Sequence, residues 1–365
     1  MKKSVITLAL VLVITLLTGC AGTPVVYYSD CTCPTGAHTA DPVETTAPAE
    51  STPVESTPVA EGAVKTGVAI IASAGESKSA GDADGEAKYD VSVVAVTVDD
   101  NGVIQSCVID SIGTSVMFDV NGAIVSDLTA EVPTKNELGD AYNMKLYGGA
   151  VAEWYEQAAA LASYACGKTV EELKTGAVDE TGHAADADLA TTATIYLGGY
   201  VAAVEKAVAN AQHLGAQAGD ELKLAVISSV DGSTSADAEN AGLAELYTNV
   251  AAVTLKDGVI TSCCIDAIQA KVNFDTTGTI TTDLSAPMQT KNELGDAYNM
   301  KTYGGAIAEW YEQAASFASY ITGKTADEVA GIAVDESTKP TEADLVTSVT
   351  IKIGEFQNLI AKAFN

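Results

Sequence analysis

The sequence predicts an α+β fold that occurs twice in tandem, each copy a twisted antiparallel sheet with helices packed on one face. Three observations lead to this prediction. The segment Thr134–Lys145 recurs unchanged as Thr290–Lys301. Short alternating apolar runs joined by turn residues come first in each copy and indicate strands. Longer amphipathic runs follow and indicate helices, so strands and helices are segregated along the chain as in α+β domains.

The repeat sets the domain boundaries. Positions 134 and 290 differ by 156, and the same offset joins other residues of the two copies: Gly102 and Gly258, Gly122 and Gly278, Trp154 and Trp310, Asp188 and Asp344. Self-similarity at a fixed period is the signature of duplicated structural units. No insertion is needed between about positions 66 and 209, which predicts two equal domains, residues 64–215 and residues 220–365.

Turn residues between apolar runs place the strands. Asn-Gly between two alternating runs is a strong hairpin signal. In the first copy, strands are expected at Val68–Ala72, Val91–Val98 and Val103–Ile109, with the hairpin turn at Asp99–Gly102. In the second copy, the opening strand is expected at Leu224–Ser228 and the hairpin turn at Lys256–Gly258. A further strand pair is expected around residues 119–122 and 276–278.

The helices follow in the same order in both copies. Helical spacing of apolar residues predicts a helix at Ala150–Cys166, which stops at Gly167. Capping boxes at Thr169–Glu172 and Thr325–Glu328 begin short helices. Each copy ends in an amphipathic helix, expected at Ile195–Ala211 and Ile351–Phe364.

The N-terminal segment predicts a lipid anchor. Lys2 and Lys3 precede an apolar run from Val5 to Leu17, which suits a signal-peptide core. The run ends in Leu17-Thr18-Gly19-Cys20, which looks like a lipobox; an ordinary secretory signal is the alternative. We therefore expect a lipoprotein signal peptide at residues 1–19, lipidation of Cys20, and a Pro/Thr/Glu-rich stalk over residues 20–63. The protein would then sit on the extracytoplasmic face of the cell membrane, held by lipid only.

Composition excludes several classes of function. The net charge of −30 disfavours nucleic acid and anionic lipid head groups as partners. The histidines, His38, His183 and His213, occupy no matching place in the two copies, and the cysteines do not form paired CxxC motifs, so a catalytic triad or a structural zinc site is not expected. Cys107, Cys166, Cys263 and Cys264 are expected to be small buried hydrophobes.

Two repeated segments are candidate functional sites. The first is the loop that precedes the tryptophan helix. It offers backbone amides near glycines, a cation, and soft or flat apolar side chains, a mix that suits a planar aromatic ligand with an anionic group. A packed loop between sheet and helix is the alternative. Its candidate residues are Lys135, Glu137, Leu138, Gly139, Tyr142 and Met144, with the twins Lys291, Glu293, Leu294, Gly295, Tyr298 and Met300.

The second segment is rich in hydroxyls and precedes the last helix of each copy. It runs over Asp186–Thr194 and Glu342–Thr350. Hydroxyls at a helix N-terminus, where N–H groups are free, favour a phosphate; a plain capping segment is the alternative. Its candidate residues are Asp188, Thr191, Thr192 and Thr194, with the twins Asp344, Thr347, Ser348 and Thr350.

The hydroxyl segment resembles the flavinylation motif of FMN-binding domains, whose pattern is roughly Asp-x-x-Ser/Thr-Gly-Ala-Thr. The loop at Glu137–Gly139, followed by the tryptophan helix, is similar to the loop before the aromatic helix of that family. The resemblance covers most of each repeat. The anchor and stalk match the family's lipoproteins of extracellular electron transfer, which are related to the flavin-carrying subunits of sodium-pumping quinone reductases. Thr192 and Ser348 replace the motif glycine and Val349 replaces the alanine, so the first copy is the closer match.

The resemblance implies two FMN groups, each joined through its phosphate to Thr194 or Thr350 by a flavin transferase. Asp188 and Asp344 would be needed by the transferase. Tyr142, Met144, Trp154 and their twins would surround the flavin ring, although core packing is the simpler role for the tryptophans. The implied function is that of an electron carrier rather than a turnover enzyme, which takes electrons from a membrane quinone or dehydrogenase donor and passes them to extracellular acceptors. The alternatives are non-covalent FMN binding and a cofactor-free ligand-binding or adhesion lipoprotein.

Overall fold

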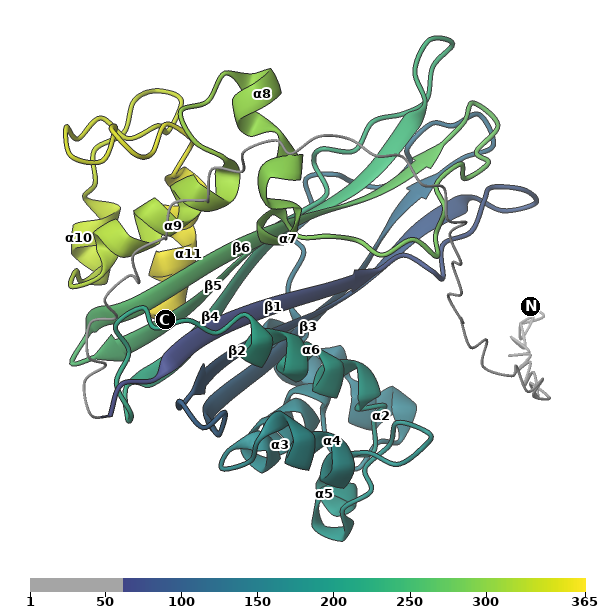
Figure 1. Ribbon diagram of the computed structural model, residues 1–365. Coiled ribbons are helices and arrows are strands. Elements are labelled where there is room, and N and C mark those ends of the chain that lie inside the picture. The colour runs from purple at the N-terminus through teal and green to yellow at the C-terminus, as the bar shows by residue number, and fades with distance from the viewer. Residues whose placement is uncertain (1–61) are drawn as a thin grey trace, which may run out of the picture. The chain divides into compact units, whose positions relative to one another are not determined.

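In the computed structural model, which describes residues 62–365, both copies have the predicted α+β fold (Figure 1). The predicted signal peptide, Cys20 and nearly all of the stalk lie outside the described residues. Within residues 62–365, no helix is long and apolar enough to cross a membrane.

Each copy forms one antiparallel sheet of three strands in sequence order. The first sheet consists of β1 (Lys65–Ser73), β2 (Gly85–Val98) and β3 (Ile104–Phe118). The second consists of β4 (Glu221–Ser229), β5 (Gly242–Lys256) and β6 (Val259–Phe274). The strands are longer than predicted, and the expected further strand pairs are single bridges, Phe118 with Ile124 and Phe274 with Ile280.

The helices follow the strands in each copy. In the first copy they are α1 (Lys135–Leu138), the 3₁₀ helix η1 (Gly139–Tyr142), α2 (Met144–Gly148), α3 (Trp154–Ala165), α4 (Val170–Ala177), α5 (Ala187–Thr192) and α6 (Gly198–Ala209). In the second they are α7 (Lys291–Leu294), the 3₁₀ helix η2 (Gly295–Tyr298), α8 (Met300–Gly304), α9 (Trp310–Ile321), α10 (Ala326–Ala330) and α11 (Gly354–Ala363). Both predicted capping boxes are confirmed, at Thr169 and at Thr325.

The strand register corrects the predicted offset between the copies. Val68 pairs with Ala95, whereas its twin Leu224 pairs with Ala252, so the offset grows from 156 in the first strands to 157 in the second. The second copy therefore has one extra residue in the loop before β5 and one fewer in the next turn, where Asn101 has no counterpart. These two changes cancel, so the offset returns to 156 in the third strands and the sequence shows no net insertion. They pair Tyr247 with Asp90 instead of Val91.

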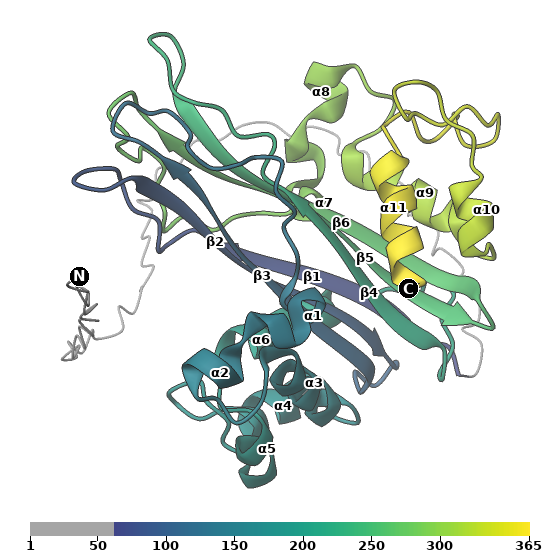
Figure 2. The ribbon, with the colours of Figure 1, turned by 180° about the vertical axis from the view of Figure 1, so that it is seen from behind.

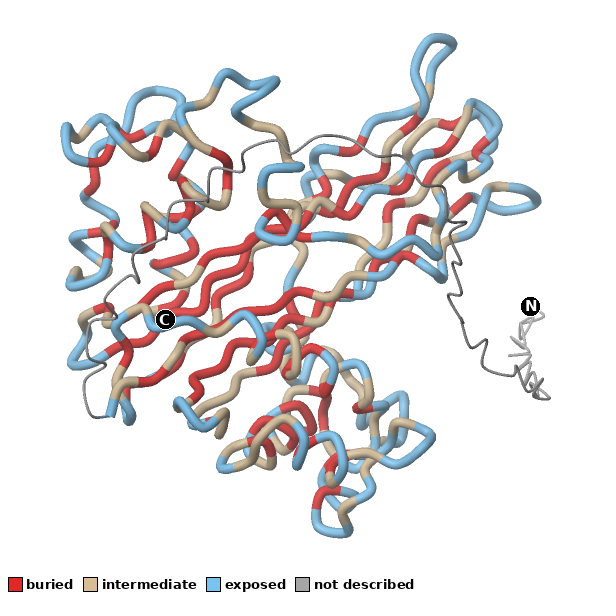
Figure 3. The backbone as a smooth tube through the Cα atoms, in the orientation of Figure 1, coloured by how far each residue is buried: buried red, intermediate tan, exposed pale blue. Residues whose placement is uncertain are grey.

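The described residues form four layers (Figures 1 and 2). One apolar core lies between the two sheets and draws on both, with Val91, Val93 and Ile112 from the first and Val250, Ile268 and Val272 from the second. Two further cores lie on the outer faces, where each sheet packs against the helices of its own copy. Figure 3 shows buried residues running along the strands of both sheets, as expected for strands covered on both faces.

Contacts between the copies occur in equivalent pairs. The rings of Phe118 and Phe274 stack with centroids 4.0 Å apart and planes 3° apart. The Ala80 amide donates to the Gly278 carbonyl at 2.8 Å, and the Ala236 amide donates to the Gly122 carbonyl at 2.7 Å. Both glycines have positive φ, and a Cβ at either would lie within 2.7 Å of a backbone oxygen of the other copy. The copies thus meet like the subunits of a symmetric dimer.

Candidate functional site

The repeated loop is anchored at its start by contacts that use its glutamates. Thr134 caps α1, and the Glu137 carboxylate accepts the Thr134 amide at 2.8 Å to complete a capping box. The other oxygen of Glu137 pairs with Lys362 of the second copy at 2.5 Å, and the twin Glu293 pairs with Lys206 at 2.7 Å. Glu137 and Glu293 thus hold the copies together. Leu138 and Leu294 are half-buried, while Gly139 and Gly295 provide the positive φ that follows α1 and α7.

The lysines of the loop lie against aromatic rings. Lys291 is 6% exposed, and its Nζ lies 4.5–5.1 Å from the ring centroids of Tyr247, Tyr298 and Trp310. It donates to the Tyr247 hydroxyl at 2.8 Å, and burial lowers the pKa of Lys291 to about 8. This cation therefore faces the protein interior.

Lys135 has a more open setting. Its Nζ lies 5.3 Å from the Tyr142 ring centroid and 5.2 Å from that of Trp154, and Asp90 stands where the second copy has Tyr247. Lys135 is half-buried. The tryptophans are core residues, 2% exposed for Trp154 and 4% for Trp310, in agreement with the simpler role considered for them.

The backbone amides of the loop are occupied. The buried Glu153 carboxylate accepts the amides of Met144 at 2.8 Å and Lys145 at 3.1 Å, which begin α2. Glu309 does the same for Met300 and Lys301 in the second copy. A carboxylate of the protein therefore occupies these two amides at the start of α2 and of α8, where an anionic ligand would otherwise bind.

The prediction that hydroxyls crowd the N-terminus of the last helix is wrong. The helix α6 begins only at Gly198, and the hydroxyl segment itself forms the short helix α5, with Asp186 as its N-cap. Thr191 and Thr192 turn their hydroxyls back to the carbonyls of Asp188 and Leu189. In the second copy, Thr347 and Ser348 do the same toward Asp344 and Leu345. The side chains of Asp188 and Asp344 are exposed.

A buried glutamine fixes the threonine at the end of each hydroxyl segment. Gln157 is fully buried on α3, and its Oε1 accepts the Thr194 amide at 2.7 Å, the Ile195 amide at 3.1 Å and the Thr194 hydroxyl at 3.3 Å. Gln313 makes the same three bonds in the second copy, at 2.8 Å and 3.2 Å to the two amides and at 3.2 Å to the Thr350 hydroxyl. These bonds engage the two amides outside any helix, and the last helix starts later than predicted, at Gly198 and Gly354.

The same glutamine reaches the repeated loop. Its Nε2 donates to the Ala152 carbonyl at 2.8 Å and contacts the Met144 sulfur at 3.5 Å; in the second copy Gln313 contacts the Met300 sulfur at 3.7 Å. The structure thus brings Thr194 and Met144 together, two residues that the sequence assigned to separate segments. Sequence reasoning missed Gln157 and Gln313, although an identical polar residue one turn after each tryptophan, on the apolar face, was a usable signal.

Exposed apolar side chains surround the end of the loop. Tyr147 is 84% exposed and its twin Tyr303 is 86% exposed. Leu146, Val151 and Ile307 are also largely exposed. Tyr147 and Val151 are matched in the second copy by Tyr303 and Ile307, whereas Thr302 replaces Leu146. The sequence had singled out none of the three aliphatic residues.

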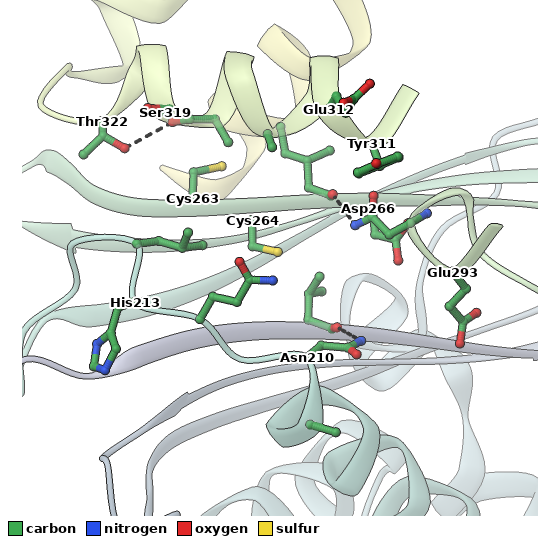
Figure 4. Close-up of a pocket in the computed structure, with 18 residues that line it drawn as sticks. Asn210, His213, Cys263, Cys264, Asp266, Glu293, Tyr311, Glu312, Ser319 and Thr322 are labelled. Carbon is green, nitrogen blue, oxygen red and sulfur yellow. Dashed lines mark hydrogen bonds between the residues drawn. The ribbon is translucent and has the colours of Figure 1, made fainter. Parts of the chain in front are cut away.

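A large cavity lies elsewhere. It measures about 1050 Å³ and is bounded by β6, α9 and the segment 209–214 that links the copies (Figure 4). Asp266, on its wall, is 2% exposed, and burial raises its pKa to about 6. Neither Thr194 nor Thr350 lines this cavity. Within the described part of the chain, no group of three or more metal-ligating side chains is close enough to hold a metal ion.

Comparison with known proteins assigns no family. No protein-family model matches the chain, and no curated protein matches it. Among solved structures, the chain is similar to the solution NMR structure of a Clostridium thermocellum protein, a target of the Northeast Structural Genomics Consortium. The two are 23% identical over 40% of this chain and 88% of the other, with a TM-score of 0.21. A likeness at this TM-score carries no argument about function.

Proposed function

We propose that this protein is a membrane-anchored electron carrier that bears one FMN on Thr194 and one on Thr350. One observation carries the proposal. In each copy, a buried glutamine ties the threonine to the Tyr/Met loop, so that the two segments expected to contact the flavin meet at one site. The same arrangement occurs twice, and the threonine hydroxyl is its reactive group.

The threonines are suited to covalent attachment. Thr194 is exposed and Thr350 half-buried, and each hydroxyl donates one long hydrogen bond to the glutamine. An ester at Oγ1 removes this bond only, since the two bonds from backbone amides to the same oxygen remain. The hydroxyls of Thr191 and Thr192 are, in contrast, engaged with carbonyls of their own helix.

The surroundings favour covalent over non-covalent binding. The amides nearest the threonine are bonded to Gln157, and those that begin α2 are bonded to Glu153. The chain also carries a net charge of −30. A phosphate would find little electrostatic attraction here, so a flavin would be retained through a covalent bond rather than through an amide-lined anion site.

The attachment is a phosphoryl transfer. A flavin transferase would direct Oγ1 of the threonine onto the phosphorus of an FMN phosphoanhydride. The O–P ester forms as the anhydride bond breaks, the phosphate on the other side of that bond leaves with the bridging oxygen, and the hydroxyl proton goes to a base of the transferase. The flavin then supplies the redox chemistry, with Tyr142, Met144 and the exposed Tyr147 as its candidate neighbours in the first copy. Electrons would pass from a membrane quinone or dehydrogenase donor to extracellular acceptors, with Cys20 and the stalk tethering the carrier.

Intact mass of protein from a host that contains a flavin transferase tests the proposal. The wild type should gain two FMN increments that survive denaturation, and T194A and T350A should each lose one. T191A is the matched control and should keep both increments. Thr191 is exposed and lies only three residues from Thr194, but it should not be modified. A colourless protein with unmodified Thr194 and Thr350 peptides would refute the proposal. Flavin released on denaturation would point to non-covalent binding instead.

A second candidate is a cofactor-free ligand-binding or adhesion lipoprotein. The exposed Tyr147 and Tyr303 favour it, because paired aromatic surfaces on one chain allow bivalent binding. It predicts that Y147A and Y303A each weaken binding to isolated cell wall, whereas T194A has no effect.

A further inference from the structure

Two cysteines of the first copy lie where α3 meets its sheet. Cys107 is on β3 and packs with the core between the first sheet and its helices. Cys166 is the C-cap residue that directly follows α3. Both side chains are half-buried and both thiols are free in the structure.

The backbone fixes the end of α3 to the strand. The Gly167 amide donates to the Ile104 carbonyl at 2.8 Å, and the Ile104 amide donates to the Lys168 carbonyl at 2.9 Å. Cys166, next to Gly167, is therefore held beside β3. Burial raises the pKa of both thiols. The nearby Cys166 raises the pKa of Cys107 further, and the backbone of Cys107 partly offsets the rise at Cys166.

The second copy shows that these two positions face a common space. The counterparts of Cys107 and Cys166 are Cys263 and Thr322, and both line the cavity between β6 and α9 (Figure 4). One position is a cysteine in both copies, while the other is a cysteine only in the first. The second copy thus provides an internal comparison.

We propose that Cys107 and Cys166 form a disulfide that clamps the end of α3 to β3 in the first copy only. A small-molecule disulfide such as oxidised glutathione is a sufficient oxidant. One protein thiolate attacks it, forms a mixed disulfide and releases one glutathione thiolate; the second protein thiolate then displaces the other. The two cysteines together lose two electrons to glutathione and two protons to solvent.

The bond would act on the helix that carries Gln157. The helix α3 fixes the backbone of Thr194 through Gln157. The disulfide would therefore restrain α3 and leave α9, which holds Thr350 through Gln313, unrestrained. The two copies, alike in their contacts, would then differ in rigidity.

The test is peptide mapping of the folded full-length chain after incubation in oxidised glutathione, with free thiols blocked before digestion. We expect a cross-linked peptide that joins Cys107 to Cys166 and the loss of two free thiols. C166T, which installs the residue found at this place in the second copy, should keep the Cys107 thiol free. If the folded wild type yields only blocked Cys107 and Cys166, the proposal is wrong.

A gain-of-function variant tests the geometry itself. T322C places a thiol opposite Cys263 and should gain a second cross-link, joining positions 263 and 322. Oxidised wild type should also unfold at a higher urea concentration than its reduced form, and C166T should show no such shift. An unfolding midpoint that is identical for oxidised and reduced wild type would contradict a clamp across α3 and β3.

Discussion

At the scale of single residues, the site depends on two buried glutamines that satisfy donors from a segment far along the chain. Gln157 accepts two backbone amides and one hydroxyl, and it donates to the Ala152 carbonyl. A buried polar side chain at this position stabilises the fold only because each of its polar atoms has a partner. Loss of the Gln157 hydrogen bonds that link Thr194 to the repeated loop should therefore lower the free energy of unfolding by a measurable amount.

Substitution Q157L should destabilise the protein by about 2–3 kcal/mol, because leucine fills the same space but leaves the Thr194 and Ile195 amides without an acceptor. Urea unfolding measures this cost, and amide hydrogen exchange at residues 194 and 195 should accelerate. Q313L is the matched variant in the second copy and should cost a similar amount. A loss below about 0.5 kcal/mol for both would mean that water replaces the glutamine without penalty.

Asp266 should make stability depend on pH. Its carboxyl is buried, which raises its pKa to about 6. Hydrogen bonds from the Thr290 side chain and from the amides of Asn292 and Ala267 lower the pKa and offset part of this rise. The folded chain thus holds the proton more tightly than the unfolded chain. The resulting stabilisation is complete below about pH 4 and is lost as the pH rises through about 6, on the order of 2–3 kcal/mol in all.

The comparison of wild type with D266N isolates this effect, because other titrating groups cancel. Stability of the wild type should fall relative to D266N between pH 4 and pH 6.5. Asp110 is the twin carboxyl, and its pKa is also raised by burial, so the double variant D110N/D266N should show a still larger difference. A pH-independent difference between wild type and D266N would show that Asp266 ionises normally in the fold.

At the scale of elements, the strands and helices were predictable in kind and order but not in length. Residues 91–98 were predicted as an alternating strand, whereas the structure buries both of its faces. The partners of such faces cannot be inferred from local patterns, so β3 was expected to end at Ile109 rather than Phe118. The start of α6 was misplaced for a related reason, since the glutamine that accepts the amides of residues 194 and 195 lies on another helix.

The turn between β2 and β3 should tolerate loss of one residue. Deletion of Asn101 converts it to the length of the Lys256–Gly258 turn, in which Asp257 and Gly258 adopt the positive φ of a tight hairpin. We expect a change below about 1 kcal/mol in the free energy of unfolding, since only the local bonds to the Asp99 side chain are lost.

The control is deletion of Val94 inside β2. Val94, Val96 and Val98 face the helices, whereas Val91, Val93 and Ala95 face the other sheet. Removal of one residue puts the rest of the strand on the wrong faces, so this variant should not fold. Circular dichroism and urea titration distinguish the two cases. Equal damage from both deletions would contradict the register.

At the scale of the described unit, residues 62–365, the two copies share a core, which the sequence did not predict. The repeat suggested two domains of equal length, and each copy does have its own sheet and helices. The sheets nevertheless bury their inner faces against each other, and Glu137 and Glu293 pair with lysines of the opposite copy. Sequence alone could not reveal these contacts, because each joins residues that no local pattern relates.

A shared core implies that the copies unfold together. Phe118 and Phe274 are fully buried and stack on each other across the interface. F118A should cost about 3–5 kcal/mol, through lost burial and the cavity left behind, and should destabilise the second copy as much as the first.

The chain has two tryptophans, Trp154 in the first copy and Trp310 in the second. W310F therefore leaves one fluorescent reporter in the first copy, and W154F leaves one in the second. In both backgrounds F118A should lower the urea midpoint by the same amount, and the two reporters should trace a single transition. Two separated transitions, or a shift confined to the Trp154 reporter, would show that the copies fold independently and that the interface contributes little to either.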